Sequence, residues 1–259
     1  MSRARWVLKE VGPPLAGLVA LIVLWAAAAS LTSSGGIASP LAVWKAFRSG
    51  VADGTIPTAA GKTLLRLAFS FAVSIVAGTA IGAGLALSEF ARRSIRPLVV
   101  ALQITPPIAV LPLAIVWFGV TERSVVFVAI VGAAPSITLS TVAAFRQIPP
   151  LLISAGRTLG AHGWQLYRSV IFPAALPGYA AGLQQAWGFA WKSLLAGELI
   201  VGAARASGLG QMLASSQHRV PALLAALAVV VLIGVAVDYL VFGVIDRRIR
   251  GRRGLLRQT

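Results

Sequence analysis

The sequence predicts an all-α integral membrane protein with about six transmembrane helices. Of its 259 residues, 58% are hydrophobic and only 12% are charged, whereas soluble globular chains average roughly 45–50% and about 25%. A water-soluble fold of this size could not cover its surface with so few charges. Long apolar stretches without the alternation of β-barrel strands indicate helices. The composition therefore excludes an ordinary cytosolic enzyme and a disordered chain.

Six stretches are long enough to cross a bilayer, which takes about 20 mostly apolar residues. They cover residues 14–31, 63–88, 97–119, 124–145, 177–201 and 221–245. No soluble domain interrupts them, so we expect one transmembrane domain over residues 1–259. The first stretch follows Arg3, Arg5 and Lys9 as a signal peptide would, but its apolar run is longer than a usual signal core, and we interpret it as a span.

The distribution of cations predicts the orientation of the chain. If both termini are cytoplasmic, most of the 23 Lys and Arg fall in cytoplasmic segments, as the positive-inside rule requires. We therefore expect a multi-pass protein of the cell inner (plasma) membrane with both ends inside. The outer segments would be 31–61, with a short helix near 40–49, and 202–220. The basic run 247–257 could bind nucleic acid, but contact with anionic membrane lipids is the simpler interpretation.

The sequence offers no catalytic or metal-binding residues. Cysteine is absent and the two histidines, His162 and His218, lie far apart, which disfavours disulfides, thiolate metal sites and a histidine cluster within one chain. Residues 61–63 read Gly-Lys-Thr like the end of a phosphate-binding loop, but the first glycine of that motif is replaced by Ile56. We interpret this match as coincidence and expect no cofactor in this chain.

The segment 149–173, between the fourth and fifth spans, predicts a short cytoplasmic helix. Pro149 and Pro150 suit a helix start because their missing N–H groups have no intrahelical partner there. The residues that follow include one apolar face and two glycines that permit close approach of another backbone; these are Leu152, Ala155, Leu159, Gly156 and Gly160. Docking into a groove of a partner protein fits this pattern, and an interfacial helix on lipid headgroups is the alternative.

The same segment resembles the EAA loop of ABC importer permeases. That loop reads Glu-Ala-Ala, three residues, Gly, nine residues, Ile, one residue, Leu-Pro. The matching positions here are Ser154, Ala155, Gly156, Gly160, Val170, Phe172 and Pro173. Ser154 in place of Glu is a departure, because it removes a charge that could cap the helix or pair with the partner.

Other stretches resemble the nitrate/sulfonate/taurine branch of these importers. They are ITPPIAVLPLAIVWFG at 104–119, GRTLGA at 156–161, and GFAWKSLLAGELIV with SGLGQML within 188–213. The resemblance implies a MetI-like, type I fold and a permease homodimer. It also implies a cytoplasmic ABC ATPase dimer that binds ATP and Mg, and an extracytoplasmic substrate-binding protein. The residues implied to contact the ATPase are Ser154, Ala155, Gly156, Leu159, Gly160 and Ala161.

Two spans contain candidates for a translocation path. The third has Pro106 and Pro107 near its middle, with Gln103 and Thr105 beside them. Proline frees backbone carbonyls, which is tolerated mainly where protein, water or a cavity satisfies them. A broken helix lining the path and a kink between packed helices are both compatible with this pattern.

The fifth span carries the residues that are costliest to place in a membrane. A mid-membrane Lys or acid costs about 2.5–3.5 kcal/mol on insertion scales, so it usually faces the protein interior. Lys192 could help an anion to pass while aromatic residues shape the cavity; the accompanying candidates are Gln184, Trp187, Trp191 and Glu198. Alternatively, Lys192 could pair with Glu198 or Asp238, or extend outward to the membrane surface.

Three function classes remain. We favour the permease subunit of an ATP-driven importer that moves a small anionic solute, such as a sulfonate, taurine or nitrate, inward by alternating access. A secondary transporter or channel should show more acids within the membrane or a filter-like repeat. A membrane enzyme that modifies lipid should show paired carboxylates or a nucleophile with its base, and none is evident.

Overall fold

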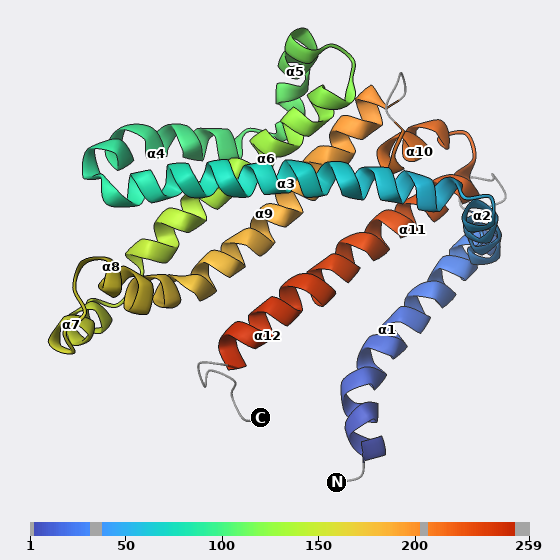
Figure 1. Cartoon of the computed structure of the whole chain (residues 1–259). Helices are drawn as coiled ribbons and strands as arrows, with labels where there is room; N and C mark the ends of the chain where they lie inside the picture. Colours follow the sequence, from blue (N-terminus) through green and yellow to red (C-terminus); the bar gives the residue numbers. More distant parts are fainter. Residues whose placement is uncertain (1–2, 32–37, 203–206, 252–259) are drawn as a thin grey trace.

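The computed structural model describes residues 3–31, 38–202 and 207–251, and the regular structure in these ranges is helical (Figure 1). The helices are α1 (Arg3–Leu31), α2 (Pro40–Ala52), α3 (Thr55–Leu87), α4 (Glu89–Ile104), η1 (Pro107–Val110), α5 (Leu111–Phe118), α6 (Glu122–Arg146), α7 (Pro150–Thr158), α8 (Gly163–Leu166), η2 (Tyr167–Ile171), α9 (Phe172–Val201), α10 (Leu209–Ser215), α11 (Val220–Val237), η3 (Asp238–Phe242) and α12 (Gly243–Gly251).

Three helices are long and apolar enough to span a membrane: Thr55–Leu87, Glu122–Arg146 and the continuous run Val220–Ile249. A fourth span results if the bent pair Glu89–Ile104 and Pro107–Phe118 is counted as one. Within the described part of α1, the apolar helix Val19–Leu31 is shorter. Helix α9 has sufficient length at 30 residues but is less apolar, since it contains Gln184, Gln185 and Lys192. The count of six spans therefore stays a prediction.

Helix α6 lies between α3 and α9 and forms the centre of the bundle. Its contact with α3 depends on Gly78 and Gly82. A Cβ added at Gly82 would lie 2.6 Å from the Thr141 Cβ and 2.7 Å from the Thr138 carbonyl oxygen. Such contacts between small residues let two backbones approach closely, which is the usual packing mode of helices in lipid.

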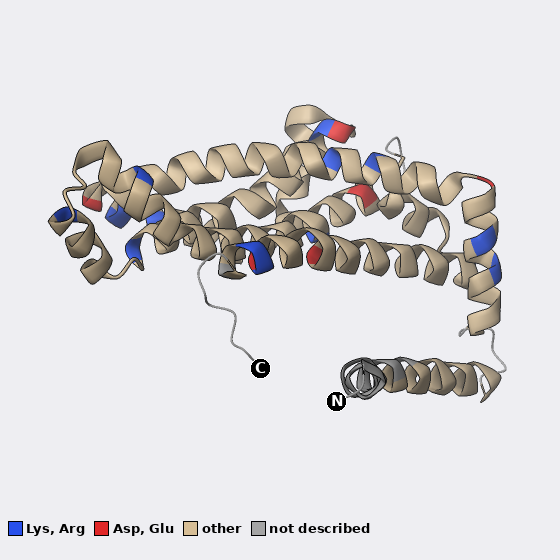
Figure 2. Cartoon of the chain, turned by 60° about the horizontal axis from the view of Figure 1, so that its bottom comes forward, with Lys and Arg blue, Asp and Glu red and all other residues tan. Residues whose placement is uncertain are grey.

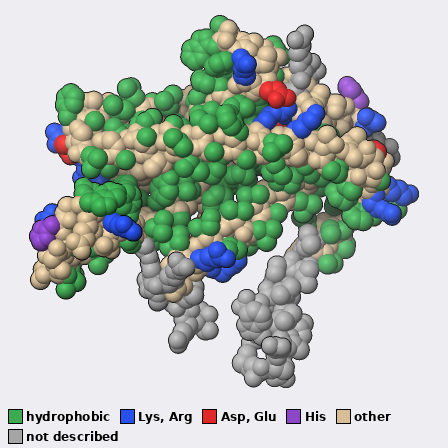
Figure 3. Space-filling model, viewed as in Figure 1, with side chains coloured by type: hydrophobic (Ala, Val, Ile, Leu, Met, Phe, Trp, Pro, Cys, Tyr) green, Lys and Arg blue, Asp and Glu red, His purple; other side chains and the backbone are tan. Residues whose placement is uncertain are grey.

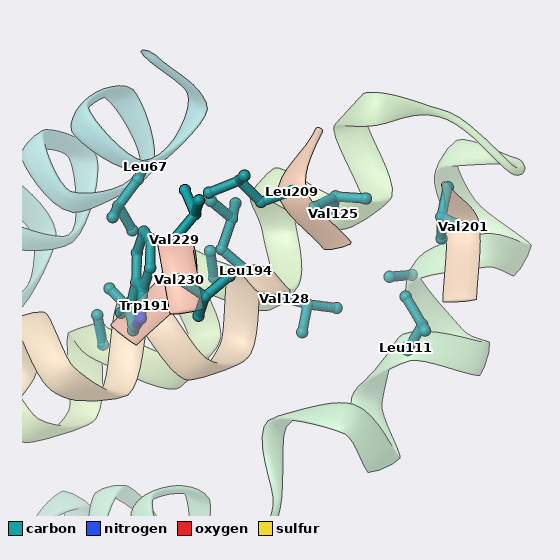
Figure 4. Close-up of a cluster of buried hydrophobic side chains, with 14 of the residues drawn as sticks. Leu67, Leu111, Val125, Val128, Trp191, Leu194, Val201, Leu209, Val229 and Val230 are labelled. Atoms are coloured by element: carbon teal, nitrogen blue, oxygen red, sulfur yellow. The ribbon is translucent and has the colours of Figure 1, made fainter. Parts of the chain in front are cut away.

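Buried aliphatic side chains join six helices at the end of the bundle near α10 (Figure 4). They include Leu67 of α3, Leu111 of α5, Val125 and Val128 of α6, Leu194 and Val201 of α9, Leu209 of α10, and Val229 and Val230 of α11. Leu209 is fully buried although α10 has only seven residues. This cluster holds the short α10 against the long helices.

The predicted interruption of the third span is present. Helix α4 ends at Ile104 and the chain resumes as η1 at Pro107, with a bend of 100° between the two parts. Pro106 and Pro107 have no N–H to continue the α-helical hydrogen-bond ladder, and the Thr105 N–H is the last to donate along it, to the Ala101 carbonyl at 3.0 Å. The helix before the break begins at Glu89, earlier than the predicted residue 97.

The predicted external helix near 40–49 is α2, which begins after Ser39. The Ser39 hydroxyl accepts from the Ala42 N–H at 3.3 Å, a normal N-cap. Gly54, with φ of +79°, then turns the chain into α3, so α3 begins earlier than the predicted residue 63. Helix α1 lies apart from the bundle in Figure 1 and joins it next to α2, where the Trp25 indole N–H donates to the Ala38 carbonyl at 3.0 Å.

Charged and apolar side chains occupy different parts of the surface. Lys and Arg gather at the end that carries α7 and α8, on α2 at the opposite end and on α12, with scattered positions on the helices between (Figure 2). Hydrophobic side chains cover the flank between these ends (Figure 3). Such an arrangement is typical of a helix bundle whose apolar flank contacts lipid. Part of the predicted basic run 247–257 lies outside the described residues.

Candidate functional site

The segment after α6 forms the short helix that its prolines predict. Pro149 is the N-cap of α7, and the helix ends in a turn in which Gly160 has φ of +86°. The N–H groups of Leu159 and Ala161 close this turn by donating to the carbonyls of Ala155 and Gly156, both at 3.0 Å. Only glycine adopts such a φ readily, which explains why this residue type stands at position 160.

Gly156 is closely approached by side chains of this chain, and not by another backbone as predicted. A Cβ at this position would lie 2.8 Å from Val170 Cγ2 and 3.1 Å from Leu166 Cδ1, so Gly156 seats α7 against α8 and η2. Ala161 is also buried, whereas Ser154, Ala155 and Gly160 are exposed. The segment therefore has a buried side that fixes α7 and an open side.

Large apolar side chains stand on the open side. Leu159 is 87% exposed, Leu151 77% and Trp164 70%. Exposed apolar side chains grouped on one short segment are typical of a site that contacts another protein or the membrane. Of the residues predicted to contact a partner, Ser154, Ala155, Leu159 and Gly160 are thus exposed, whereas Gly156 and Ala161 are buried against the chain itself. The role of this segment in coupling stays a prediction.

Lys192 lines two cavities, one between α9 and the broken helix and one between α9 and the segment of α11 and η3. One, of about 290 Å³, is lined by Pro107, Ile108, Phe189, Lys192, Ser193 and Ala196. The other, of about 330 Å³, is lined by Gln184, Trp187, Gly188, Trp191, Lys192, Gly234, Val235, Asp238 and Tyr239. Pro107 thus shares a cavity with Lys192 alone among the candidates of α9, whereas Gln184, Trp187 and Trp191 line the second cavity together with Lys192. Gln103, Thr105 and Pro106 do not line either cavity, and Thr105 and Pro106 are exposed.

Lys192 is exposed, and its ammonium lies 5.1 Å from the ring centroid of Phe189, a cation–π distance. Neither of the two acids proposed as alternative partners pairs with it. Asp238 accepts a hydrogen bond from the Gln184 amide at 2.8 Å, and Glu198 pairs with Arg66. Within the described part of the chain, no carboxylate lies within ion-pair distance of Lys192.

Tryptophans of α9 form the wall of the second cavity. The rings of Trp187 and Trp191 stack with centroids 6.4 Å apart, and Trp187 also meets Phe71 of α3 edge to face at 5.6 Å. These contacts fix the wall between α3 and α9 without closing the space beside Lys192. Aromatic side chains thus line this cavity, as predicted.

Glu198 lies away from both cavities, in a buried polar network at the α10 end of the bundle. Its side chain is completely buried. It accepts hydrogen bonds from Arg66 Nη1 at 2.7 Å, from the Thr63 hydroxyl at 2.8 Å and from the Gly210 N–H at 3.0 Å. The sequence analysis did not identify Thr63 and Arg66 as site residues and placed them only within the predicted span 63–88. Their spacing of three residues on one helix face was the available signal.

Residues 61–63, which match the end of a phosphate-binding loop in sequence, do not form a loop in the structure. These residues are part of the continuous helix α3, whereas that motif requires a loop whose N–H groups point at a phosphate. The Lys62 ammonium instead donates to the Ser207 hydroxyl at 2.6 Å.

Comparison with known proteins identifies the family. Residues 56–251 match the family model described as "Binding-protein-dependent transport system inner membrane component". This match covers well over half of the chain. The chain belongs to this family. The permease is 30% identical over 167 residues to the taurine transport system permease protein TauC of Escherichia coli, a match that covers 64% of this chain and 60% of TauC.

A second relative is the nitrate import permease protein NrtB of Synechocystis sp., at 27% identity over 198 residues, covering 73% of this permease and 72% of that protein. Among solved structures, the fold resembles that of a chain in the inward-facing MetNI methionine ABC transporter, with a TM-score of 0.62, 23% identity and coverage of 76% of this chain and 97% of the other. The chain spans 53% and 60% of the length of the first two curated relatives it matches.

Family membership confirms three predictions. The fold is MetI-like, the chain is a multi-pass component of the inner membrane, and it is a transport subunit rather than an enzyme. The resemblance to the taurine and nitrate branch is confirmed as well.

Proposed function

We propose that this permease moves a small anionic solute, of the sulfonate, taurine or nitrate type, inward through the membrane. The observation that carries the anionic preference is Lys192, which lines the cavity beside the broken helix and the cavity beside α11, and has no carboxylate partner in the described ranges. An ammonium without a counter-ion attracts negative charge strongly in a medium of low dielectric. The relatives named for taurine and nitrate transport support the same solute class.

The energy for transport comes from a cytoplasmic ABC ATPase dimer that binds ATP and Mg. Helix α7 is the coupling helix, and the exposed Leu151 in its first turn and Leu159 at its C-cap enter a groove of the ATPase. Because Gly156 seats α7 directly on α8 and η2, a displacement of α7 passes to α9, which continues from η2 without interruption. Ser154, Ala155 and Gly160 contribute the exposed remainder of the contact surface.

The assembled importer contains two copies of this permease, each with six spans and both termini in the cytoplasm. Helices α1 and α9 are then the spans beyond the four that hydropathy supports. An extracytoplasmic binding protein delivers the solute at the end that carries α2 and α10. Anionic membrane lipids contact the basic helix α12, in which Arg247 and Arg248 follow Asp246.

The proposal is tested by uptake into proteoliposomes that contain the permease, its ATPase and its binding protein, with labelled taurine and nitrate as solutes. We expect Lys192→Met to lower uptake about tenfold, equivalent to ~1.4 kcal/mol, without changing assembly with the ATPase. Lys192→Arg, which retains the charge, should preserve most of the uptake. Equal uptake by the Met and Arg variants would remove Lys192 from the path.

A further inference from the structure

Three helices and one connection meet at Glu198. Thr63 and Arg66 come from α3, Glu198 comes from α9, and the segment Ser207–Gly210 leads into α10. Arg66 Nη1 donates both to Glu198 and to the Ser207 carbonyl at 2.8 Å, while the Leu209 N–H donates to the Thr63 hydroxyl at 2.8 Å. We call these residues, Thr63, Arg66, Glu198 and Ser207–Gly210, the Glu198 network.

Two glycines let the connection lie directly on the carboxylate. A Cβ at Gly208 would collide with the carboxylate oxygens of Glu198, and one at Gly210 would collide with the Glu198 Cβ and lie 2.8 Å from the Leu195 carbonyl oxygen. The backbone therefore approaches Glu198 more closely than any larger residue allows. Such a fit holds the connection in one position while the hydrogen bonds remain formed.

Water can reach the outer side of this network. A cavity of about 450 Å³ lies beside it, with Lys62, Ser207 and Gly208 in its lining together with Asp53, Thr58 and Gln211. Arg66 also pairs with Glu122, whose side chain is 58% exposed. When the polar groups that hold α10 separate, water and the Glu122 carboxylate are therefore within reach as alternative hydrogen-bond partners. A contact made only of apolar side chains and closed to water would offer neither.

Helix α9 connects this network to the opposite end of the molecule. It runs without interruption over 30 residues from Phe172, next to η2, to Val201, and Glu198 lies in its last turn. A rigid helix of this length transmits a displacement at one end to the other. Movement imposed at α7 therefore acts on the contacts of Glu198.

We propose that Arg66, Thr63 and Glu198 are positioning residues that hold α10 closed over the extracytoplasmic ends of α3 and α9, and that this contact opens and closes in each transport cycle. The inference rests on the proposed function for its orientation in the membrane. The network holds the external side shut until movement of α9 separates Glu198 from the Ser207–Gly210 connection. The residues act on the solute only through the position of α10.

The absence of cysteine from the sequence permits a direct test. In the double variant Lys62→Cys/Ser207→Cys, a short bifunctional methanethiosulfonate joins α3 to the connection before α10, and a reductant removes it. In proteoliposomes with the ATPase and binding protein, we expect the cross-link to lower solute uptake at least tenfold and the reductant to restore it. Each single-cysteine variant treated with the same reagent should retain its uptake. Uptake that continues unchanged through the cross-linked permease would overturn the inference.

A second measurement does not depend on transport. Thr63→Val keeps the side-chain volume but removes the hydroxyl that joins Glu198 to Leu209. We expect this variant to increase the rate at which a membrane-impermeant maleimide labels Ser207→Cys at least fivefold, compared with the same cysteine beside the native Thr63. An unchanged labelling rate would show that the network does not hold α10, and would overturn the inference even in a complex that takes up solute. If Thr63→Val speeds labelling but the native permease shows no ATP-dependent uptake, the proposed function is refuted, while the contact between the Glu198 network and α10 is established.

Discussion

Arg66 and Glu198 lie 132 positions apart in the sequence, yet the guanidinium Nη1 and the carboxylate Oε1 meet at 2.7 Å in the interior of the bundle. The Arg66 side chain is 9% exposed and that of Glu198 is fully buried. Three donors surround the carboxylate, so the charge is compensated in place. This pair, rather than a pair between Lys192 and Glu198, is the buried ionic contact of α9.

Replacement of Glu198 tests this compensation. Removing one partner of a buried ion pair costs about 3–5 kcal/mol when the other charge is left uncompensated. Because Arg66 also pairs with Glu122, we expect Glu198→Ala to lower the free energy of unfolding by less than this amount. Glu198→Gln should lower it less still, since the amide oxygen still accepts hydrogen bonds. Thermal denaturation of the detergent-solubilised permease measures both. Equal loss in the two variants would show that hydrogen bonding to this side chain contributes little.

The contact between α3 and α6 is tested by two glycines on the same helix. Gly82→Ala places a Cβ 2.6 Å from the Thr141 Cβ, and overpacking of this kind costs about 1–3 kcal/mol. Gly84→Ala is the matched control, because nothing lies within 4 Å of a Cβ there. We expect the first variant to have a lower thermal midpoint and the second to equal or exceed the native value. The reverse order would contradict the close packing of α3 on α6.

The exposed leucine of the coupling segment is expected to matter for assembly and not for folding. Leu159 is 87% exposed, and surface substitutions of this kind usually change stability by about 0.5 kcal/mol or less. We expect Leu159→Asp to abolish co-purification of the ATPase while leaving the thermal midpoint of the isolated permease unchanged. Undiminished co-purification would exclude Leu159 from the coupling contact.

The turn between α2 and α3 is expected to make the stability of the fold depend on pH. The Thr55 backbone N–H donates to the Asp53 carboxylate at 2.9 Å, and this bond, followed by the Thr55 hydroxyl, holds the pKa of Asp53 below its ordinary value of 3.8. A depressed pKa in the folded state stabilises the fold above the unfolded value, and the contribution is lost as the pH falls through the folded pKa.

We therefore expect Asp53→Asn to have a lower thermal midpoint than the native permease at neutral pH, with the difference vanishing as the pH falls well below 3.8. Parallel melting curves over that pH range measure it. A constant difference at all pH values would assign the effect of the substitution to something other than ionisation of Asp53.

The sequence alone was sufficient to predict the features that arise from the preferences of individual residues or of a single helix. Pro106 and Pro107 lack the N–H groups that a helix needs, so the break between α4 and η1 could be predicted without knowing what surrounds it. Pro149 likewise marks the start of α7 by its own backbone preference. The end of α7 at Gly160 was not predicted: this residue was expected to permit close approach of another backbone, but it has φ of +86° and no described atom lies within 4 Å of an added Cβ. The long apolar stretches at α3, α6 and α11 were recognisable because lipid imposes its demand on each helix separately.

Features that depend on the relative rotation of helices could not be predicted. Whether Glu198 pairs with Lys192 or with Arg66 depends on how α3 and α9 are turned against each other. Hydropathy carries no signal for that rotation when both helices are apolar on most sides. The predicted approach of another backbone at Gly156 is replaced by contact with the side chains of Val170 and Leu166, which could not be predicted because the chain reverses between α7 and η2.

The most direct test of the account is whether nucleotide drives uptake. Proteoliposomes should contain the permease with its ATPase and binding protein, with ATP enclosed on the ATPase side and labelled taurine or nitrate supplied on the other. We predict accumulation of solute that requires hydrolysable ATP and ceases with a non-hydrolysable analogue or with Leu159→Asp. Accumulation at the same rate in vesicles emptied of nucleotide would contradict the account and indicate a secondary transporter or channel.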